Sequence, residues 1–456
     1  MFEIDSDLTE VKDLFSKRLK KARLLYGISQ DDLVQFLDSI DAGISKEELI
    51  QYEHGLALPN STKLIELANS LKLKFGYFFR PITIKNADIQ FRKNISLQQE
   101  ESNSLKERVA ESLERYAEIE YHLKQNNPEY CLSSATDYLP PITDSLSTFI
   151  GFSNPIKNET IDSFTDINKV VYTLLNAWEL GYNGLPNVIK IIEDKGIKIL
   201  EFHQYQSINA LSGWVNKTTP FIVIKPRVDS ILKENEDAMI GDSKLLSLGD
   251  NSSNEYTFDD LEELMGIAQG YEQKRFFVLR ELGYLLLNFS PEITDKKKED
   301  LCSEFAAAML MPYKIFMKEV GNKRKYGIRI GELRNIKKIY GIPIHVVIDR
   351  ARRLEIITET EYLRFKKSVS LHISDLIDDK KAHEGQAPSA IINVREEQQL
   401  KKSVYYTKYK EDKVEHPIKF MQLVYKAVDD DVISMSKGAG LCNEKAGYFR
   451  EHYMHI

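Results

Sequence analysis

The stretch Arg275–Leu287 holds the residues whose types and spacing come closest to a catalytic pattern. It reads RFFVLRELGYLLL. In the pattern H-E-x-x-H, two imidazoles one helical turn apart hold Zn²⁺, and the glutamate between them activates the bound water. Here Arg280 and Tyr284 stand at the imidazole positions. Because an arginine stays cationic and a phenol is not a usual zinc ligand, we expect no metal or other cofactor, and Glu281 as a vestigial catalytic residue.

A second motif follows in residues 299–312, which read EDLCSEFAAAMLMP. The pair R-F-x-x-x-[H]-E-L-G-[H]-L-L-L and E-x-x-x-x-x-F-A-A-x-x-L-M-P resembles the ImmA/IrrE family of zinc metallopeptidase-like proteins. The resemblance implies a zincin-like α+β domain in which an acidic residue of the second helix completes the metal site. Glu299 matches one of two glutamates common there, and Leu301 replaces the other. One acidic ligand does not hold zinc, which needs at least three protein ligands.

The guanidinium of Arg280 offers a positive charge where the family has its metal. We expect it to pair with Glu281 or Glu299, and Tyr284 to supply a hydroxyl group. Such a pocket binds a peptide or small ligand without cutting it. A purely structural ion pair explains the same residues equally well. A metallopeptidase that is active through an atypical site is a further alternative, and it needs ligands that this sequence does not show.

Composition restricts the function classes. The 456 residues are 42% hydrophobic and carry a net charge of −7. This is long enough for two or three domains, and too acidic for a protein that coats nucleic acid over its whole surface. Three cysteines far apart in the sequence indicate a reducing compartment. Without a leader or an apolar run of ~20 residues, we expect a cytoplasmic protein with no membrane partner.

The N-terminal region reads as a bundle of short helices. A helix ends near Gly27, Ser29 caps the next, and Ser45 caps a third that begins at Lys46. The motifs G-I-S-Q-x-x-L, I-Q-Y-E-x-G and P-x-x-x-x-L-x-x-L-A, over roughly residues 10–75, resemble the Xre-type helix-turn-helix of phage repressors. The resemblance implies a second helix that lies in the major groove of double-stranded DNA, with phosphate contacts from the preceding helix and the caps.

Several side chains of this region are candidates for DNA contact. Lys46, Glu47 and Gln51 are expected to face bases. The full set of candidates is Lys17, Arg18, Lys20, Lys21, Gln30, Ser45, Lys46, Glu47 and Gln51. Two observations favour a protein-binding helical module instead. Residues 1–80 hold eleven Lys and Arg against thirteen Asp and Glu, and residues 38–42 lengthen the turn before Ser45.

The chain divides into four predicted regions. They are a helix-turn-helix bundle (1–82), a helical connector and linker (83–165), a peptidase-like domain (166–358) and a C-terminal tail (359–456). In the connector, we expect a helix that opens at Ser104 in a capping box with Glu107. The predicted fold class is mainly α, with a small zincin-like α+β domain.

Within the peptidase-like domain, alternation predicts three short strands at residues 197–202, 210–215 and 221–224. On a later helix, Arg350, Arg352 and Arg353 are expected on the exposed side. Residues 229–270 form an insert with eleven acidic residues against two lysines. A solvated loop explains this composition, and a lid or DNA-mimicking arm is the sharper hypothesis.

These observations predict a homodimeric, DNA-binding transcriptional regulator whose peptidase-like body senses a ligand or partner. An antitoxin-like or phage-defence interaction protein that does not bind DNA is the alternative, beside the atypical metallopeptidase. A gel-shift titration against salt separates the DNA-binding hypothesis from the interaction hypothesis, because phosphate contacts give a steep salt slope.

Overall fold

The structure is a computed structural model. It describes residues 2–25, 27–71, 73–80, 88–92, 99–126, 152–202, 209–225, 271–324, 327–367 and 415–454. This part of the chain is mainly helical with a small mixed sheet. It divides into two compact units. The first comprises Met1–Gly151, Trp214–Thr219 and Lys419–Ile456, and the second comprises Phe152–Gly213 and Pro220–Ile418.

The first unit begins with a bundle of short helices. They are α1 (Phe2–Leu25), α2 (Gln30–Ser39), α3 (Lys46–Glu53), α4 (Ser61–Ser70) and the 3₁₀ helix η1 (Phe75–Phe79). Their apolar faces meet in one core, where Phe15, Leu33, Leu37 and Leu49 are fully buried. The Ser29 and Ser45 side chains cap α2 and α3, as the sequence predicted. The capped helix starts fix where each helix of the bundle begins.

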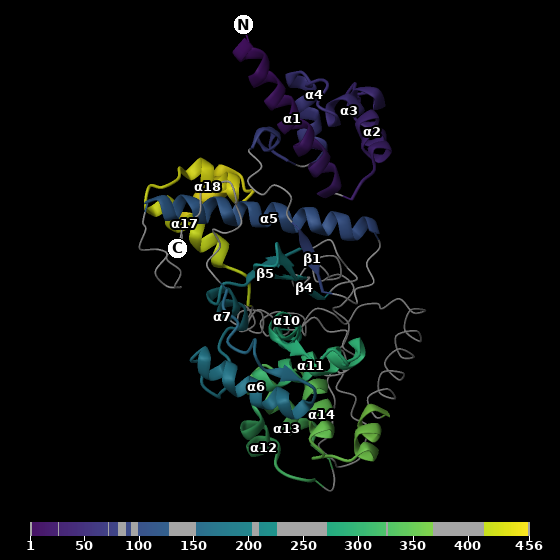
Figure 1. The fold of residues 1–456 in the computed structure, drawn as a ribbon, viewed down its shortest axis with the longest axis vertical. Coiled ribbons are helices and arrows are strands. Elements are labelled where there is room, and N and C mark those ends of the chain that lie inside the picture. Colours follow the sequence, from purple (N-terminus) through teal and green to yellow (C-terminus); the bar gives the residue numbers. More distant parts are fainter. Residues whose placement is uncertain are drawn as a thin grey trace, which may run out of the picture. The chain divides into compact units, whose positions relative to one another are not determined.

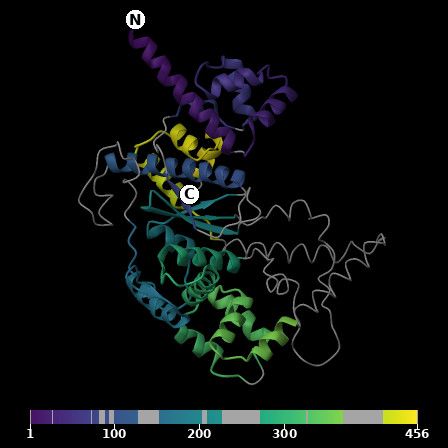
Figure 2. The ribbon, with the colours of Figure 1, turned by 45° about the vertical axis from the view of Figure 1, so that its right-hand side comes forward.

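The rest of the first unit is built on one long helix, α5 (Gln99–Asn126). The C-terminal helices α17 (Lys419–Asp429), α18 (Met435–Leu441) and α19 (Ala446–Met454) belong to the same unit. In both views the yellow C-terminal helices lie beside α5 (Figures 1 and 2). The predicted tail (359–456) therefore divides, because its last 38 residues, 419–456, pack in the first unit.

Ser104 does not open a helix. It lies inside α5, and its hydroxyl group donates a hydrogen bond to the Leu25 carbonyl at 3.3 Å. The prediction of a capping box at this position was wrong, because α5 begins at Gln99, five residues before Ser104. The polar group that looked like a cap instead contacts the end of α1.

The second unit combines helices with most of the sheet. Its helices are α6 (Phe164–Ala177), α7 (Val188–Asp194), α10 (Tyr271–Leu286), α11 (Asp295–Leu310), α12 (Tyr313–Val320), α13 (Ile330–Tyr340) and α14 (Ile344–Arg353). Two short strands, β2 (Thr160–Ile161) and β6 (Asn288–Phe289), pair in parallel. The contacts of α10 with α11, and of α11 with α6, form the centre of the helical layer (Figure 1).

The three predicted strands are confirmed as β3 (Lys198–Glu201), β4 (Ala210–Val215) and β5 (Thr219–Ile224). With β1 (Ile89–Phe91) they form a sheet in the order β1-β4-β5-β3. β3 runs parallel to β5. Positive φ angles of 50° at Asn216 and 59° at Lys217 give the two-residue type I′ turn that joins β4 to β5.

The motif helix α10 lies very close to α11 because Gly283 has no side chain. A Cβ atom at this position would come within 3.2 Å of the Phe305 ring and 3.3 Å of the Cys302 sulfur. A run of fully buried alanines, Ala306–Ala308, continues the tight packing along α11. Small residues on both helices therefore bring the backbone of the motif against its neighbour.

Two predictions lie outside the described residues: the acidic insert (229–270) and most of the linker in residues 127–151. Among the described residues, no helix has both the length and the apolar character needed to cross a membrane.

Candidate functional site

The N-terminal helical bundle is held in shape by one carboxylate at the end of α3. Glu53 accepts hydrogen bonds from Arg23 of α1, at 2.6 Å from Nε and 3.0 Å from Nη2. Nε2 of Gln30 donates to the same carboxylate at 2.6 Å. A bidentate arginine pair is geometrically specific. Glu53 therefore fixes α1, the start of α2 and the end of α3 relative to one another.

The turn between α2 and α3 spans residues 40–45, longer than the three or four residues usual for the motif. Asp41 and Gly43 adopt positive φ angles of 54° and 61°, which lets the chain reverse within this span. Ile44 is 1% exposed and packs in the core of the bundle. The longer turn is thus anchored from inside the bundle.

The exposed face of α3 carries Lys46, Glu47 and Gln51. Lys46 forms an ion pair with Asp31 of α2. Ser45 is committed to capping, since its Oγ accepts from the Glu48 amide at 3.2 Å. A hydrogen bond to Lys63, followed by the Ser45 amide, lowers the pKa of Glu48. The face therefore presents both charge signs and one neutral amide.

The predicted basic cluster on α1 does not stay together. Lys17 and Lys20 are exposed, and Lys17 pairs with Asp13 at 2.6 Å. The Arg18 side chain is 0% exposed and lies 3.1 Å from both Glu111 and Glu114 of α5. Lys21 pairs with Glu114 at 2.8 Å. Arg18 and Lys21 are therefore corrected from phosphate contacts to internal ion pairs.

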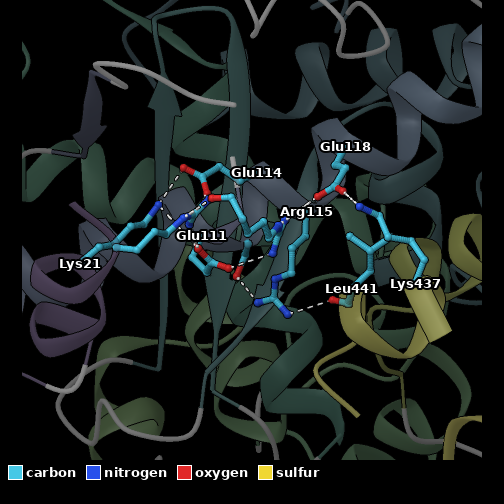
Figure 3. Close-up of polar contacts among 10 residues, drawn as sticks. Lys21, Glu111, Glu114, Arg115, Glu118, Lys437 and Leu441 are labelled. Atoms are coloured by element: carbon cyan, nitrogen blue, oxygen red, sulfur yellow. Dashed lines mark hydrogen bonds and ion pairs between the residues drawn. The ribbon is translucent and has the colours of Figure 1, made fainter. Parts of the chain in front are cut away.

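We call these pairs and their neighbours the α5 charge network. It comprises Arg18, Lys21, Arg80, Glu111, Glu114, Arg115, Glu118 and Lys437. Figure 3 shows Glu111, Glu114, Arg115 and Glu118 of α5 together with Lys21 and Lys437, which come from separate segments. Glu118 is shared, because one oxygen lies 2.8 Å from Nη2 of Arg80 and the other pairs with Lys437. Arg115 donates to the Leu441 carbonyl at 3.3 Å.

The cations of the network determine the charge of its carboxylates. Burial raises the pKa of Glu111, but Lys21, Arg115, Arg80 and Arg18 outweigh it, and the net shift is downward. Burial likewise raises the pKa of Glu118, and Arg80 and Lys437 bring it below its ordinary value. Both side chains are consequently ionised near neutral pH.

In the second unit, the central residue of the degenerate motif is closed off from water. Glu281 is 0% exposed. Its Oε2 atom accepts hydrogen bonds from the amide of Ser212 at 3.0 Å and from the Ser212 hydroxyl at 2.8 Å. Its Oε1 atom lies 3.5 Å from Nη2 of Arg280. Both carboxylate oxygens therefore have partners within the protein.

The other predicted pocket residues do not all gather at Glu281. The guanidinium of Arg280 also lies over the Phe277 ring, 5.0 Å from its centroid. Tyr284 is partly buried one turn further along α10, whereas Glu299 is exposed near the start of α11. Among the described residues, the ion pair of Arg280 is with Glu281 and not with Glu299. Of the two predicted partners of Arg280, Glu281 is therefore confirmed, and the pair lies within α10.

The residues present do not fit the zinc site that the resemblance implies. A cation and a phenol occupy the imidazole positions, Leu301 is fully buried, and Glu281 is committed to Ser212. In the described part of the chain, no three His, Cys, Asp or Glu side chains gather as a metal ion requires. The arrangement can neutralise a buried carboxylate, and it lacks a donor set for a Lewis acid.

Sequence reasoning missed two groups of residues in this unit. Ser212 was assigned only to a strand, although it is the partner of Glu281. Arg350 was expected on the exposed side, but its side chain is 0% exposed and pairs with Glu304 at 3.1 Å. Arg353 pairs with the other oxygen of Glu304 at 3.0 Å. Three arginines and Asp349 stand together in this stretch, so the local sequence does not mark Arg350 as the buried one; its partner Glu304 lies on another helix.

A hollow of about 410 Å³ lies elsewhere in the second unit, between Lys323, Arg324, Arg352, Glu355 and the helix start at Thr358. None of the four predicted pocket residues lines it. No family model matches the chain, and no curated protein or solved structure matches it either.

Proposed function

We propose that this protein is a cytoplasmic DNA-binding transcriptional regulator of the Xre type, with a peptidase-like second unit that resembles the ImmA/IrrE family and senses a ligand or partner. One observation carries the DNA-binding half. The capped helices α2 and α3 are fixed by Glu53 and leave Lys46, Glu47 and Gln51 exposed on one helix. A rigid helix with exposed polar side chains is what readout in the major groove needs.

The sensing half is favoured by the state of Glu281. A buried carboxylate whose oxygens are engaged by Ser212 and Arg280 holds α10 to β4, and it is not poised for proton transfer. A body of this kind can bind without hydrolysis. We further propose a homodimer, because helix-turn-helix proteins read two half-sites with two copies.

The experiment that tests DNA binding is a salt titration of affinity with the full-length protein, using genomic fragments that co-purify with it. Gln51→Ala is expected to weaken specific binding by roughly tenfold and to relax sequence preference, as for one lost base contact. The matched control is Asn69→Ala, an exposed amide on α4, which should bind like the parent. Binding without a salt slope, or an equal loss in both variants, contradicts the proposal.

Loss of peptidase activity is tested separately. The purified protein is expected to contain no stoichiometric zinc and to leave unfolded polypeptides uncut. Proteolysis that a chelator stops and added zinc restores contradicts the pseudoenzyme half and leaves the DNA-binding half intact. Glu281→Gln is the matching variant, because it keeps the shape of the side chain and removes its charge.

A protein-interaction function without DNA is the second candidate, and a specific observation favours it. Two cations of the predicted cluster, Arg18 and Lys21, are consumed by α5, and Lys46 faces Asp31. This leaves the helix-turn-helix surface with little net positive charge for phosphates. A protein partner that binds with the same affinity at low and high salt supports this candidate over the first.

A further inference from the structure

The α5 charge network joins two parts of the chain that lie at opposite ends of the sequence. Glu118 of α5 pairs with Arg80, just after η1, and with Lys437 of α18. Through its carbonyl oxygen, Arg80 accepts a hydrogen bond from the buried Arg18 of α1 at 2.9 Å. One carboxylate therefore connects the C-terminal helices with the seat of the helix-turn-helix on α5 (Figure 3).

The two sides of this joint differ in strength. The helix-turn-helix side uses Arg18, which is 0% exposed, and the carboxylates of Glu111 and Glu114 beside it. On the C-terminal side, the Lys437 side chain is 45% exposed. Exposed ion pairs contribute little and are screened by salt, whereas buried ones are costly to break. The C-terminal side is therefore the one that opens first.

The C-terminal helices also depend on α5 for their stability. They are 11, 7 and 9 residues long, shorter than the ~12–15 residues at which isolated helices become even marginal in water. Their apolar faces pack against one another and on α5, where the Tyr116 and Phe420 rings lie 4.9 Å apart. Elements of this kind open locally at low free energy.

The chain enters these helices from a buried anchor in the second unit. Glu415 accepts hydrogen bonds from the Val188 and Ile189 amides at the start of α7, and lies 3.5 Å from Arg275 on the motif helix α10. Only three residues separate Glu415 from α17. A shift of α10 would therefore change the contact between Arg275 and Glu415, just before the chain enters α17.

From these contacts we propose that residues 419–456 act as a releasable clamp on α5, which controls how firmly the helix-turn-helix is seated. This inference rests on the proposed function, since it names how sensing by the second unit reaches the DNA-binding surface. When the clamp is docked, Lys437 fixes the Glu118 carboxylate against Arg80, and the helix-turn-helix is held on α5. When the clamp is released, Glu118 is more mobile, and α1, which contacts Arg80 through Arg18, is held less firmly.

The first test is hydrogen exchange on the full-length protein with Lys437→Glu, which places a negative charge against Glu118. Amides of η1 and the second half of α1 are expected to exchange roughly three- to tenfold faster than in the parent. The matched control is Lys445→Glu, the same charge change at an exposed lysine of the same segment. Equal exchange in the two variants overturns the clamp.

A second variant releases the clamp without changing charge. A Cβ atom at Gly438 would come within 3.0 Å of the Phe449 ring and 3.1 Å of Val428, so Gly438→Val forces α17, α18 and α19 apart. Faster exchange in η1 as well as in these helices supports the clamp. Faster exchange that is confined to α17–α19, with η1 as in the parent, contradicts it.

DNA affinity, measured in parallel, separates this inference from the proposed function. If the parent protein binds DNA, Lys437→Glu should weaken binding by about three- to tenfold, since a loosely seated reader must be ordered on binding. Lys445→Glu should bind like the parent, and equal binding by all three proteins contradicts control of the reader by the clamp. If the parent binds no DNA, the proposed function fails, and the exchange data alone decide whether the clamp exists.

Discussion

In the first unit, the carboxylates of α5 hold side chains that come from both ends of the sequence, whereas in the second unit Glu281 holds its own neighbour Arg280 and one strand residue, Ser212. In the first unit, several segments meet on the charged residues of α5, and Lys437 is half exposed. In the second unit, both oxygens of the fully buried Glu281 have partners on α10 and β4. The charge pairs of the first unit thus range from buried to half exposed, whereas the carboxylate at the centre of the second is fully buried.

The largest effect is expected from Arg18→Met, which removes the fully buried cation that pairs with both Glu111 and Glu114 and leaves them with more exposed partners such as Lys21. Breaking one partner of a buried ion pair costs about 3–5 kcal/mol. We expect the first unit to lose stability by that amount in urea denaturation followed by hydrogen exchange, while the second unit is unaffected. Lys17→Met, one position earlier and exposed, is the control. If the loss is no larger than that of the control, the network is not the main support of the N-terminal helical bundle.

Glu281→Ala is expected to destabilise the second unit by about 2–3 kcal/mol, because it leaves the Ser212 amide and hydroxyl buried without an acceptor. Glu281→Gln keeps an acceptor oxygen and should cost less. Glu299→Ala, at an exposed position on α11, should leave the melting temperature unchanged. An equal change in melting temperature for Glu281→Ala and Glu299→Ala would mean that the hydrogen bonds between Glu281 and Ser212 do not stabilise the second unit.

Local patterns were enough to predict much of this fold. Serine caps at positions 29 and 45 and the three strands of the second unit depend on residues within a few positions, so a single sequence reveals them. The departure from H-E-x-x-H at Arg280 and Tyr284 is also visible in the sequence alone.

The buried ion pairs were not predictable in the same way. Arg18 lies 93 residues from Glu111 and 96 from Glu114 in the sequence. Arg350 and its partner Glu304 likewise lie on different helices, α14 and α11. An arginine on an amphipathic helix is usually exposed. Burial of such an arginine becomes evident only when its carboxylate partner on another helix is known. Helical periodicity carries no information about that partner.

The response to pH has opposite signs at Glu415 and at the carboxylates Glu111 and Glu118. Glu111 and Glu118 have lowered pKa values, caused by nearby cations that outweigh burial, so their contribution to stability is present above the ordinary carboxyl pKa and is lost as pH falls below it. Burial raises the pKa of Glu415, so its contribution is present at low pH and is lost as pH rises through that raised value.

As pH falls from neutral, Glu415 takes up a proton before a carboxyl group with an ordinary pKa does, and the start of α7 should gain protection. Below about 4.5, amides of α1 and α5 should lose protection. Hydrogen exchange corrected for intrinsic rates measures both, and Glu415→Gln should abolish the first change and leave the second. Loss of protection in both units over the same pH window would contradict the assignment of opposite signs.

The smallest effect concerns an exposed pair and sharpens the contrast with the buried ones. Asp31→Asn removes the charged partner of Lys46. The Asp31 side chain is 71% exposed and that of Lys46 is 49% exposed, so folding stability should stay nearly constant. DNA affinity should rise by about two- to fivefold at low salt, with a salt slope steeper by about one unit, because Lys46 becomes free to contact a phosphate. Asp38→Asn, the same charge change at an exposed position near the end of α2, is the control, and it should leave the salt slope unchanged. An equal rise in both variants would reduce the effect to net charge and remove Lys46 from the contact surface.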